Sequence, residues 1–150
     1  MQQRLDYTKV YPEAVKGMLE FEKFAATSGL ERALYELVKT RASQINGCAY
    51  CLDMHTKDAR KAGETEQRLY ALSAWRETSF YTDRERAALE WTEALTLISK
   101  NDVPDSLYDS VRRYFGEKEM VALTMAIIAI NGWNRLAIGF RTVPGTYQPK

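Results

Sequence analysis

Both cysteines and the single histidine of this 150-residue chain lie within eight positions, in the segment Cys48-Ala49-Tyr50-Cys51-Leu52-Asp53-Met54-His55. Cys48 precedes Cys51 by three residues, and His55 follows Cys51 by four. Residues three and four apart share one face of an α-helix, so a helix that opens at Cys48 would bring the three side chains together. The positive end of the helix dipole would also favour a thiolate there. The segment therefore predicts a dithiol beside an imidazole.

Three hypotheses can explain this group of side chains. The first is a redox-active dithiol, because this spacing allows a disulfide within one helical turn and the imidazole can exchange a proton with Cys51. The second is a zinc site, since two thiolates and an imidazole are good zinc ligands. Such a site needs a fourth ligand, and only Asp53, Asp58 or Glu36 could provide it. The third is a pair of buried structural thiols. Spacing alone favours the redox hypothesis without excluding the others.

The composition is that of an ordinary soluble globular protein, with 45% hydrophobic and 27% charged residues. The net charge of +1 gives no argument for a nucleic-acid or membrane partner. The polar N-terminus lacks the apolar core of a signal peptide, and the most apolar run, residues 120–130, is too short to span a bilayer. We therefore expect a cytoplasmic protein with no membrane association. The length predicts one domain over residues 1–150.

Helical periodicity dominates the chain, and no stretch shows convincing period-two alternation. After an extended arm to Tyr11, we expect seven helices, over residues 12–27, 30–45, 48–62, 65–75, 82–99, 106–115 and 117–138. Thr82 with Glu85 forms a capping-box pattern, and the Asn46-Gly47 pair interrupts the periodicity just before the cysteines. The last helix is apolar on most sides, which predicts burial by several neighbours or by another subunit. The prediction is an all-α domain of six to seven helices.

A wider pattern adds Glu36, which lies twelve positions before Cys48. A glutamate, eleven intervening residues and Cys-x-x-Cys-x-x-x-His resemble the core pattern of the AhpD-like alkylhydroperoxidases, within the wider carboxymuconolactone decarboxylase family. The flanking segments that share the resemblance are residues 43–47, 59–63, 131–135 and 143–145. The resemblance implies a helical AhpD-like fold. An unplaced glutamate is usually solvated, but this pattern instead implies that Glu36 orients His55 from the preceding helix.

The resemblance also implies roles for the four residues. Cys51 matches the cysteine that attacks the peroxide and becomes a sulfenic acid, and Cys48 matches the proton donor and resolving cysteine. His55 and Glu36 match the proton relay that activates the thiol and protonates the leaving alkoxide. These roles agree with thiol chemistry, in which the thiolate is the nucleophile and a sulfenic acid condenses with a nearby thiol. The implied function is an antioxidant peroxidase for alkyl or hydrogen peroxide, with no cofactor or bound metal.

The sequence departs from the family pattern at Tyr50, where the best-known peroxidase of the family has a second histidine. Tyrosine is a poor base near neutral pH, so the completeness of the proton relay stays open. The partners implied are a peroxide substrate, a dithiol reductant or reductase protein, and further copies of the chain in a homo-oligomer. Two alternative functions remain: a carboxymuconolactone-decarboxylase-type enzyme, and a non-catalytic redox-sensing or interaction protein. The preferred peroxide, the reductant and the oligomer number do not follow from the sequence.

Overall fold

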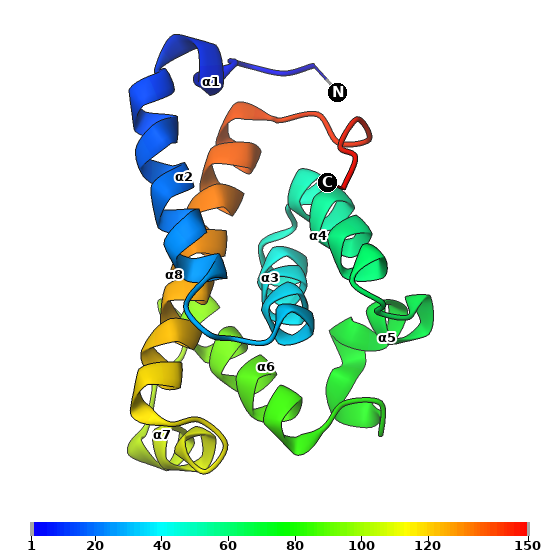
Figure 1. Ribbon diagram of the computed structural model, residues 1–150, viewed down its shortest axis with the longest axis vertical. Helices are drawn as coiled ribbons and strands as arrows, with labels where there is room; N and C mark the ends of the chain where they lie inside the picture. Colours follow the sequence, from blue (N-terminus) through cyan, green and yellow to red (C-terminus); the bar gives the residue numbers. More distant parts are fainter. Residues whose placement is uncertain (1, 150) are drawn as a thin grey trace.

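The computed structural model describes residues 2–149, and within them the chain forms eight α-helices and one 3₁₀ helix (Figure 1). The elements are α1 Tyr7–Val10, α2 Pro12–Ala26, α3 Arg32–Asn46, α4 Ala49–Lys61, α5 Glu66–Ala71, η1 Leu72–Glu77, α6 Asp83–Thr96, α7 Asp105–Arg112 and α8 Glu117–Phe140. No β-strand occurs between residues 2 and 149, so the all-α class is confirmed.

The predicted helix count of six to seven is slightly wrong. The arm expected up to Tyr11 contains α1, whose four residues are too few to show a helical period. The helix expected over residues 65–75 ends at Ala71 and continues as the 3₁₀ helix η1, with non-helical dihedrals at Ala74. By contrast, the capping box of Thr82 and Glu85 is present at the start of α6.

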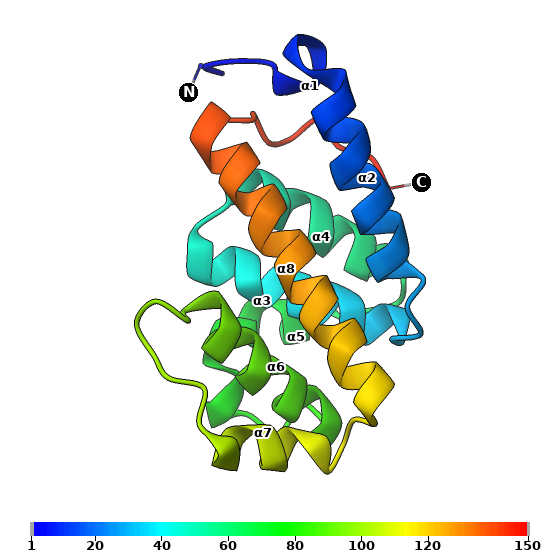
Figure 2. The same cartoon turned by 90° about the vertical axis from the view of Figure 1, so that its left-hand side faces the viewer.

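Helix α3 is the central element and packs against α4, α6 and α8 (Figures 1 and 2). Helix α2 lies along α8, and α6 and α7 pack together beneath them. Nine residues of α3 are buried, including the polar side chains of Glu36, Lys39, Thr40 and Ser43. Buried polar groups are costly unless they are hydrogen-bonded, so this helix needs partners from its neighbours.

The largest apolar cluster fills the space between α3, α6, α7 and α8. Its buried members are Leu34, Val38, Ala87, Ala88, Trp91, Val111, Phe115, Met120, Leu123 and Ile127. These residues recur at the helical spacing seen in the sequence, which explains why the helices could be located without the structure. Trp75 and Trp91 are buried packing residues, whereas Trp133 is only partly buried.

Helix α8 is longer than the apolar run at residues 120–130 suggested. Among the described residues it is the one helix with an 18-residue window that is long and apolar enough to span a membrane. The expectation that no segment reaches this length is therefore wrong. Half of that window is buried inside the fold, and the core helix of a soluble protein has the same length and composition.

The turn between α3 and α4 sets the position of the dithiol. Gly47 ends α3 in the left-handed conformation, with φ 71° and ψ 33°, and Cys48 follows as the N-cap of α4. The Sγ of Cys48 accepts a hydrogen bond of 3.3 Å from the backbone N–H of Cys51. The break predicted at Asn46-Gly47 therefore places both cysteines at a helix N-terminus.

Replacing Gly47 by alanine should destabilise the protein, because an L-residue in the left-handed region costs about 1–2 kcal/mol. The matched control is Gly17→Ala in the exposed middle of α2, where an added Cβ meets no atom within 4 Å. Alanine there should stabilise the protein by about 0.5–1 kcal/mol. Urea denaturation of both variants measures the difference, and a shift of the same sign in both would contradict this account of the turn.

Candidate functional site

The two cysteines are joined as a disulfide, and both are almost fully buried, at 1% exposure each. Cys48 packs with Ala42 and Ile130 in a small apolar cluster, whereas Cys51 also lines a cavity. The spacing therefore did bring the two sulfurs together as expected. In this oxidised form they are not thiolate ligands, and zinc binding is an alternative only for the reduced protein.

His55 lies one helical turn after Cys51 and contacts Glu36 on α3. Its Nδ1 is 2.8 Å from Oε2 of Glu36, and both side chains are buried. The other carboxylate oxygen of Glu36 forms a 2.7 Å ion pair with Arg32, which lies one turn earlier in α3. The predicted contact between Glu36 and His55 across two helices is thus present, and Glu36 is not a solvated charge.

The contact with Glu36 determines which nitrogen of His55 can act as a base. A carboxylate only accepts hydrogen bonds, so Nδ1 carries the proton and donates a hydrogen bond to Glu36. Nε2 then presents its lone pair, and this buried atom has no hydrogen-bond partner within residues 2–149. Burial lowers the pKa of His55, and the opposing effect of Glu36 does not restore it to its ordinary value. The imidazole is therefore neutral and able to accept a proton near pH 7.

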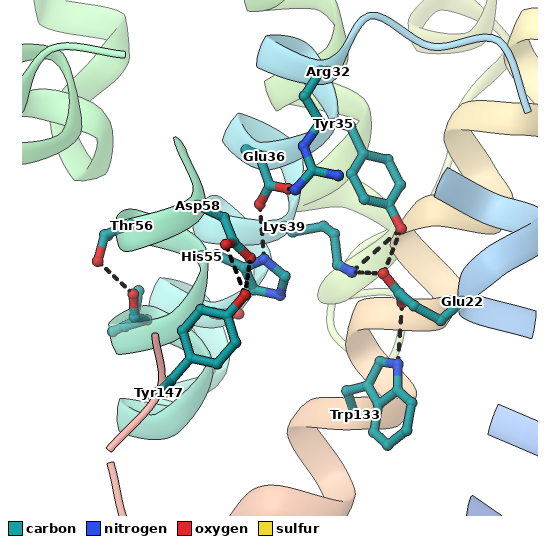
Figure 3. Close-up of polar contacts among 12 residues, drawn as sticks. Glu22, Arg32, Tyr35, Glu36, Lys39, His55, Thr56, Asp58, Trp133 and Tyr147 are labelled. Atoms are coloured by element: carbon teal, nitrogen blue, oxygen red, sulfur yellow. Dashed lines mark hydrogen bonds and ion pairs between the residues drawn. The ribbon is translucent and has the colours of Figure 1, made fainter. Parts of the chain in front are cut away.

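A cavity of about 510 Å³ opens beside these residues, between α1, α2, α3, α4 and α8 (Figure 3). Its lining residues are Tyr7, Thr8, Val15, Leu19, Glu22, Arg32, Tyr35, Glu36, Lys39, Tyr50, Cys51, Met54, His55, Asp58, Trp133 and Ala137. A larger hollow of about 850 Å³ lies on the surface between α4, α5 and the C-terminal tail, but none of the four predicted site residues lines it. Chemistry at Cys51 must therefore use the smaller cavity.

A second polar group, which the sequence did not reveal, lines the same cavity. The carboxylate of Glu22 on α2 accepts hydrogen bonds from Tyr35 at 2.7 Å, from Trp133 at 3.1 Å and from Lys39 (Figure 3). Burial raises the pKa of Glu22, but the Lys39 ammonium outweighs this effect and holds the pKa below its usual range. The partly exposed Glu22 and the buried Lys39 therefore form an ion pair in the cavity wall.

The C-terminal tail closes another side of the site. The hydroxyl of Tyr147 donates a hydrogen bond to the carboxylate of Asp58 in α4, at 2.7 Å from Oδ1 and 2.9 Å from Oδ2 (Figure 3). Asp58 in turn lies close to Glu36 and His55. Burial and the hydrogen bond to Asp58 raise the pKa of Tyr147 to about 12. The tail is also held by Lys57, which donates to the Tyr147 carbonyl.

Side-chain amides hold the turn before Cys48 against α8. Asn46 donates to Asn131 at 3.0 Å and to Asn134 at 2.8 Å, and Asn134 donates to Ser43 at 3.1 Å. The segment 131–135 was part of the family resemblance, but the sequence did not show what its asparagines contact. They connect the end of α3 to α8 and so fix the start of the cysteine helix.

Two further residues near the site have clear surroundings. Arg41, on the same helix as Glu36, forms a 2.8 Å ion pair with Glu93 of α6. Tyr50 lines the cavity, and burial raises its pKa, so its hydroxyl stays protonated near neutral pH. Tyr50 can therefore donate a hydrogen bond into the cavity but does not replace a histidine base.

Comparison with known proteins gives a consistent picture. The model of the carboxymuconolactone decarboxylase family matches residues 12–94, which is more than half of the chain. The uncharacterized protein YdfG of Bacillus subtilis is 51% identical over 138 residues, which cover 92% of this chain and 94% of that protein. The uncharacterized protein YnjA of Escherichia coli is 28% identical over 100 residues, and the match spans 54% of its length.

Solved structures share the fold. A protein of unknown function from Agrobacterium tumefaciens, described as a candidate antioxidant defence protein AhpD, is similar with a TM-score of 0.94 and 44% identity; the match covers 97% of this chain and all of the other. The debrominase Bmp8 has a TM-score of 0.82 at 18% identity, over 93% of this chain and 75% of its own, which shows a common fold alone. The chain therefore belongs to the carboxymuconolactone decarboxylase family, as an AhpD-like member.

Proposed function

We propose that the protein is a thiol-dependent peroxidase that uses Cys51 as its nucleophile. The observation that carries the proposal is the position of Cys51, which lines the cavity one turn before His55. The Nδ1 of His55 is held by Glu36, and its Nε2 is left without a partner among the described residues. This arrangement of a thiol, a neutral base and an orienting carboxylate is the general form of an activated nucleophile.

The catalytic cycle starts from the reduced dithiol. His55 accepts the proton of Cys51, and the thiolate attacks the terminal oxygen of the hydroperoxide. The O–O bond breaks, Cys51 becomes a sulfenic acid, and the alkoxide takes up a proton to leave as an alcohol. The Cys48 thiol then attacks the Cys51 sulfur and releases water, which yields the disulfide present in this structure. Two electrons and two protons from a dithiol reductant restore both thiols.

The cavity favours an uncharged organic hydroperoxide over a charged one. Most of its lining is apolar, with Val15, Leu19, Met54 and Ala137 among the contributing side chains. Four of the charged lining groups are already paired with one another, Arg32 with Glu36 and Lys39 with Glu22, and the fifth, Asp58, accepts a hydrogen bond from Tyr147. A charged substrate would have to displace one of these pairs, whereas an apolar alkyl group can be buried without doing so.

The partners and location are part of the proposal. The disulfide needs a dithiol reductant or a reductase protein, and the dithiol chemistry suits a reducing compartment such as the cytoplasm. Large apolar side chains are exposed on α2 and α8, among them Phe24, Val121 and Ile128, and subunit contacts in a homo-oligomer would cover them.

Steady-state consumption of tert-butyl hydroperoxide tests this function, with dihydrolipoamide, thioredoxin or glutathione supplied as the reductant. We expect sustained turnover with at least one dithiol, and the loss of two titratable thiols when the reduced protein meets one equivalent of peroxide. Oxidation without turnover by any reductant would favour a redox sensor. Activity on a γ-carboxylactone without peroxide reactivity would favour a decarboxylase, and one zinc per chain in the reduced protein would refute the redox assignment.

A further inference from the structure

The cavity contains a buried lysine that the proposed mechanism does not use. Lys39 is 1% exposed and is among the largest fully buried side chains of the described chain. It lies on α3, one turn after Glu36, and lines the cavity together with Cys51 and His55. Lysine is rarely buried completely unless it is paired, and Lys39 is paired with Glu22.

Stability does not explain this ion pair well. Lys39 is removed from water completely and Glu22 for the most part. The cost of burying charges often exceeds their attraction, so an apolar pair of similar volume would serve a purely structural purpose as well or better. Here three helices instead hold the charged pair in the wall of a cavity. Glu22 comes from α2, and its hydrogen-bond donors are Lys39 and Tyr35 of α3 and Trp133 of α8 (Figure 3). Such an arrangement is expected of a functional group.

The hydrogen bonds leave one proton of Lys39 available. The ammonium group has three donors, of which one is directed to Glu22 and one to the hydroxyl oxygen of Tyr35 at 3.3 Å. No third acceptor occurs within the described range 2–149. The remaining N–H can therefore serve a molecule in the cavity, and Figure 3 shows the Lys39 ammonium between the ring of His55 and the carboxylate of Glu22.

We propose that Lys39 is the proton donor to the leaving alkoxide, which divides the acid and base roles between Lys39 and His55. This inference rests on the proposed peroxidase function. His55 takes the proton of Cys51, the thiolate attacks the terminal peroxide oxygen, and the O–O bond breaks. Lys39 then gives one proton to the alkoxide oxygen and becomes a neutral amine. The proton held by His55 restores the ammonium, so the step as a whole converts a thiol and a hydroperoxide into a sulfenic acid and an alcohol.

The electrostatics of the cavity support this division of roles. Burial lowers the pKa of Lys39, and the nearby Glu22 only partly opposes this effect, so the ammonium is a stronger acid than an exposed lysine. Burial also lowers the pKa of His55, and the charge of Lys39 lowers it further. A neutral imidazole and a protonated amine are the states that a base and an acid need at the start of the reaction.

The test compares two oxidants that differ in their leaving group. The tert-butoxide released from tert-butyl hydroperoxide must be protonated, whereas the acetate released from peracetic acid is stable as an anion. The rate of Cys51 oxidation by each is measured in a single turnover of the reduced protein. In Lys39→Met the rate with tert-butyl hydroperoxide should fall on the order of a hundredfold, as for the loss of a general acid. The rate with peracetic acid should change less than about threefold, because the barrier to expelling acetate does not depend on a proton donor.

Controls separate this role from a structural one. Lys100→Met removes an exposed lysine and should leave both rates unchanged. The double variant Glu22→Gln/Lys39→Met leaves no unpaired charge in the cavity and should show the same selective loss as Lys39→Met. An equal loss with both oxidants, or no loss with either, would overturn the assignment of Lys39 alone. A wild-type protein that reacts with peracetic acid but not with tert-butyl hydroperoxide would overturn the peroxidase function and this inference together.

Discussion

Replacing Cys51 by serine is expected to abolish peroxide consumption, with a loss of at least about a thousandfold, because the hydroxyl of serine is not ionised near neutral pH and cannot replace the thiolate. Cys51 lines the cavity, and Cys48 is the only other cysteine in the sequence that could take over its role. Steady-state turnover of tert-butyl hydroperoxide in the presence of a dithiol reductant measures the loss.

Cys48→Ser is the matched control, since it removes the buried partner and keeps the nucleophile. This variant should still react once with peroxide and then stop as a stable sulfenic acid, which a dimedone adduct on Cys51 detects by mass spectrometry. The thermal midpoints of both variants should be similar, because each loses the same disulfide and gains the same hydroxyl. If Cys48→Ser turned over normally, or if Cys51→Ser formed the dimedone adduct at Cys48, the assigned order of the two cysteines would be wrong.

Replacing His55 by glutamine is expected to slow Cys51 oxidation by about 100- to 10,000-fold at pH 7, the usual range for a lost general base. Glutamine can still donate a hydrogen bond to Glu36 but cannot take the proton of Cys51. Above about pH 8.5, where a cysteine thiol ionises without help, the deficit should become smaller. Stopped-flow measurement of Cys51 oxidation between pH 5 and 10 tests this convergence, and a deficit that stays constant across the range would exclude a base role for His55.

The same histidine predicts a pH-dependent stability. Its pKa in the folded protein lies below the ordinary histidine value of about 6.5, because burial disfavours the imidazolium. The unfolded chain therefore binds more protons below pH 6.5, and stability should be complete above that value and decrease as the pH falls towards the folded pKa. Urea denaturation of the wild type and of His55→Gln should show a smaller decrease in the variant between pH 6.5 and 5, since glutamine does not titrate.

The sequence by itself determined the helices and the local part of the site. Helical periodicity, the glycine at position 47 and the capping box at Thr82 are properties of short segments, so most of the elements could be located without the structure. The alignment of Cys48, Cys51 and His55 also follows from their spacing on one helix. The four-residue helix α1 was missed because it is too short to produce a period, and the start of the 3₁₀ helix η1 was predicted as part of the preceding α-helix.

The contact between Glu36 and His55 came from a resemblance to known sequences, and only the tertiary structure shows it as a 2.8 Å contact between two helices. No pattern in the sequence predicts the ion pair of Glu22 with Lys39 or the hydrogen bond of Tyr147 to Asp58. These pairs join residues 17 and 89 positions apart, so their formation depends on how the helices pack. Helix α3 is buried by neighbours on several sides, so its buried polar residues do not stand out from an exposed polar face. The spacing of residues thus determined which groups could react, whereas helix packing decided which charges surround them.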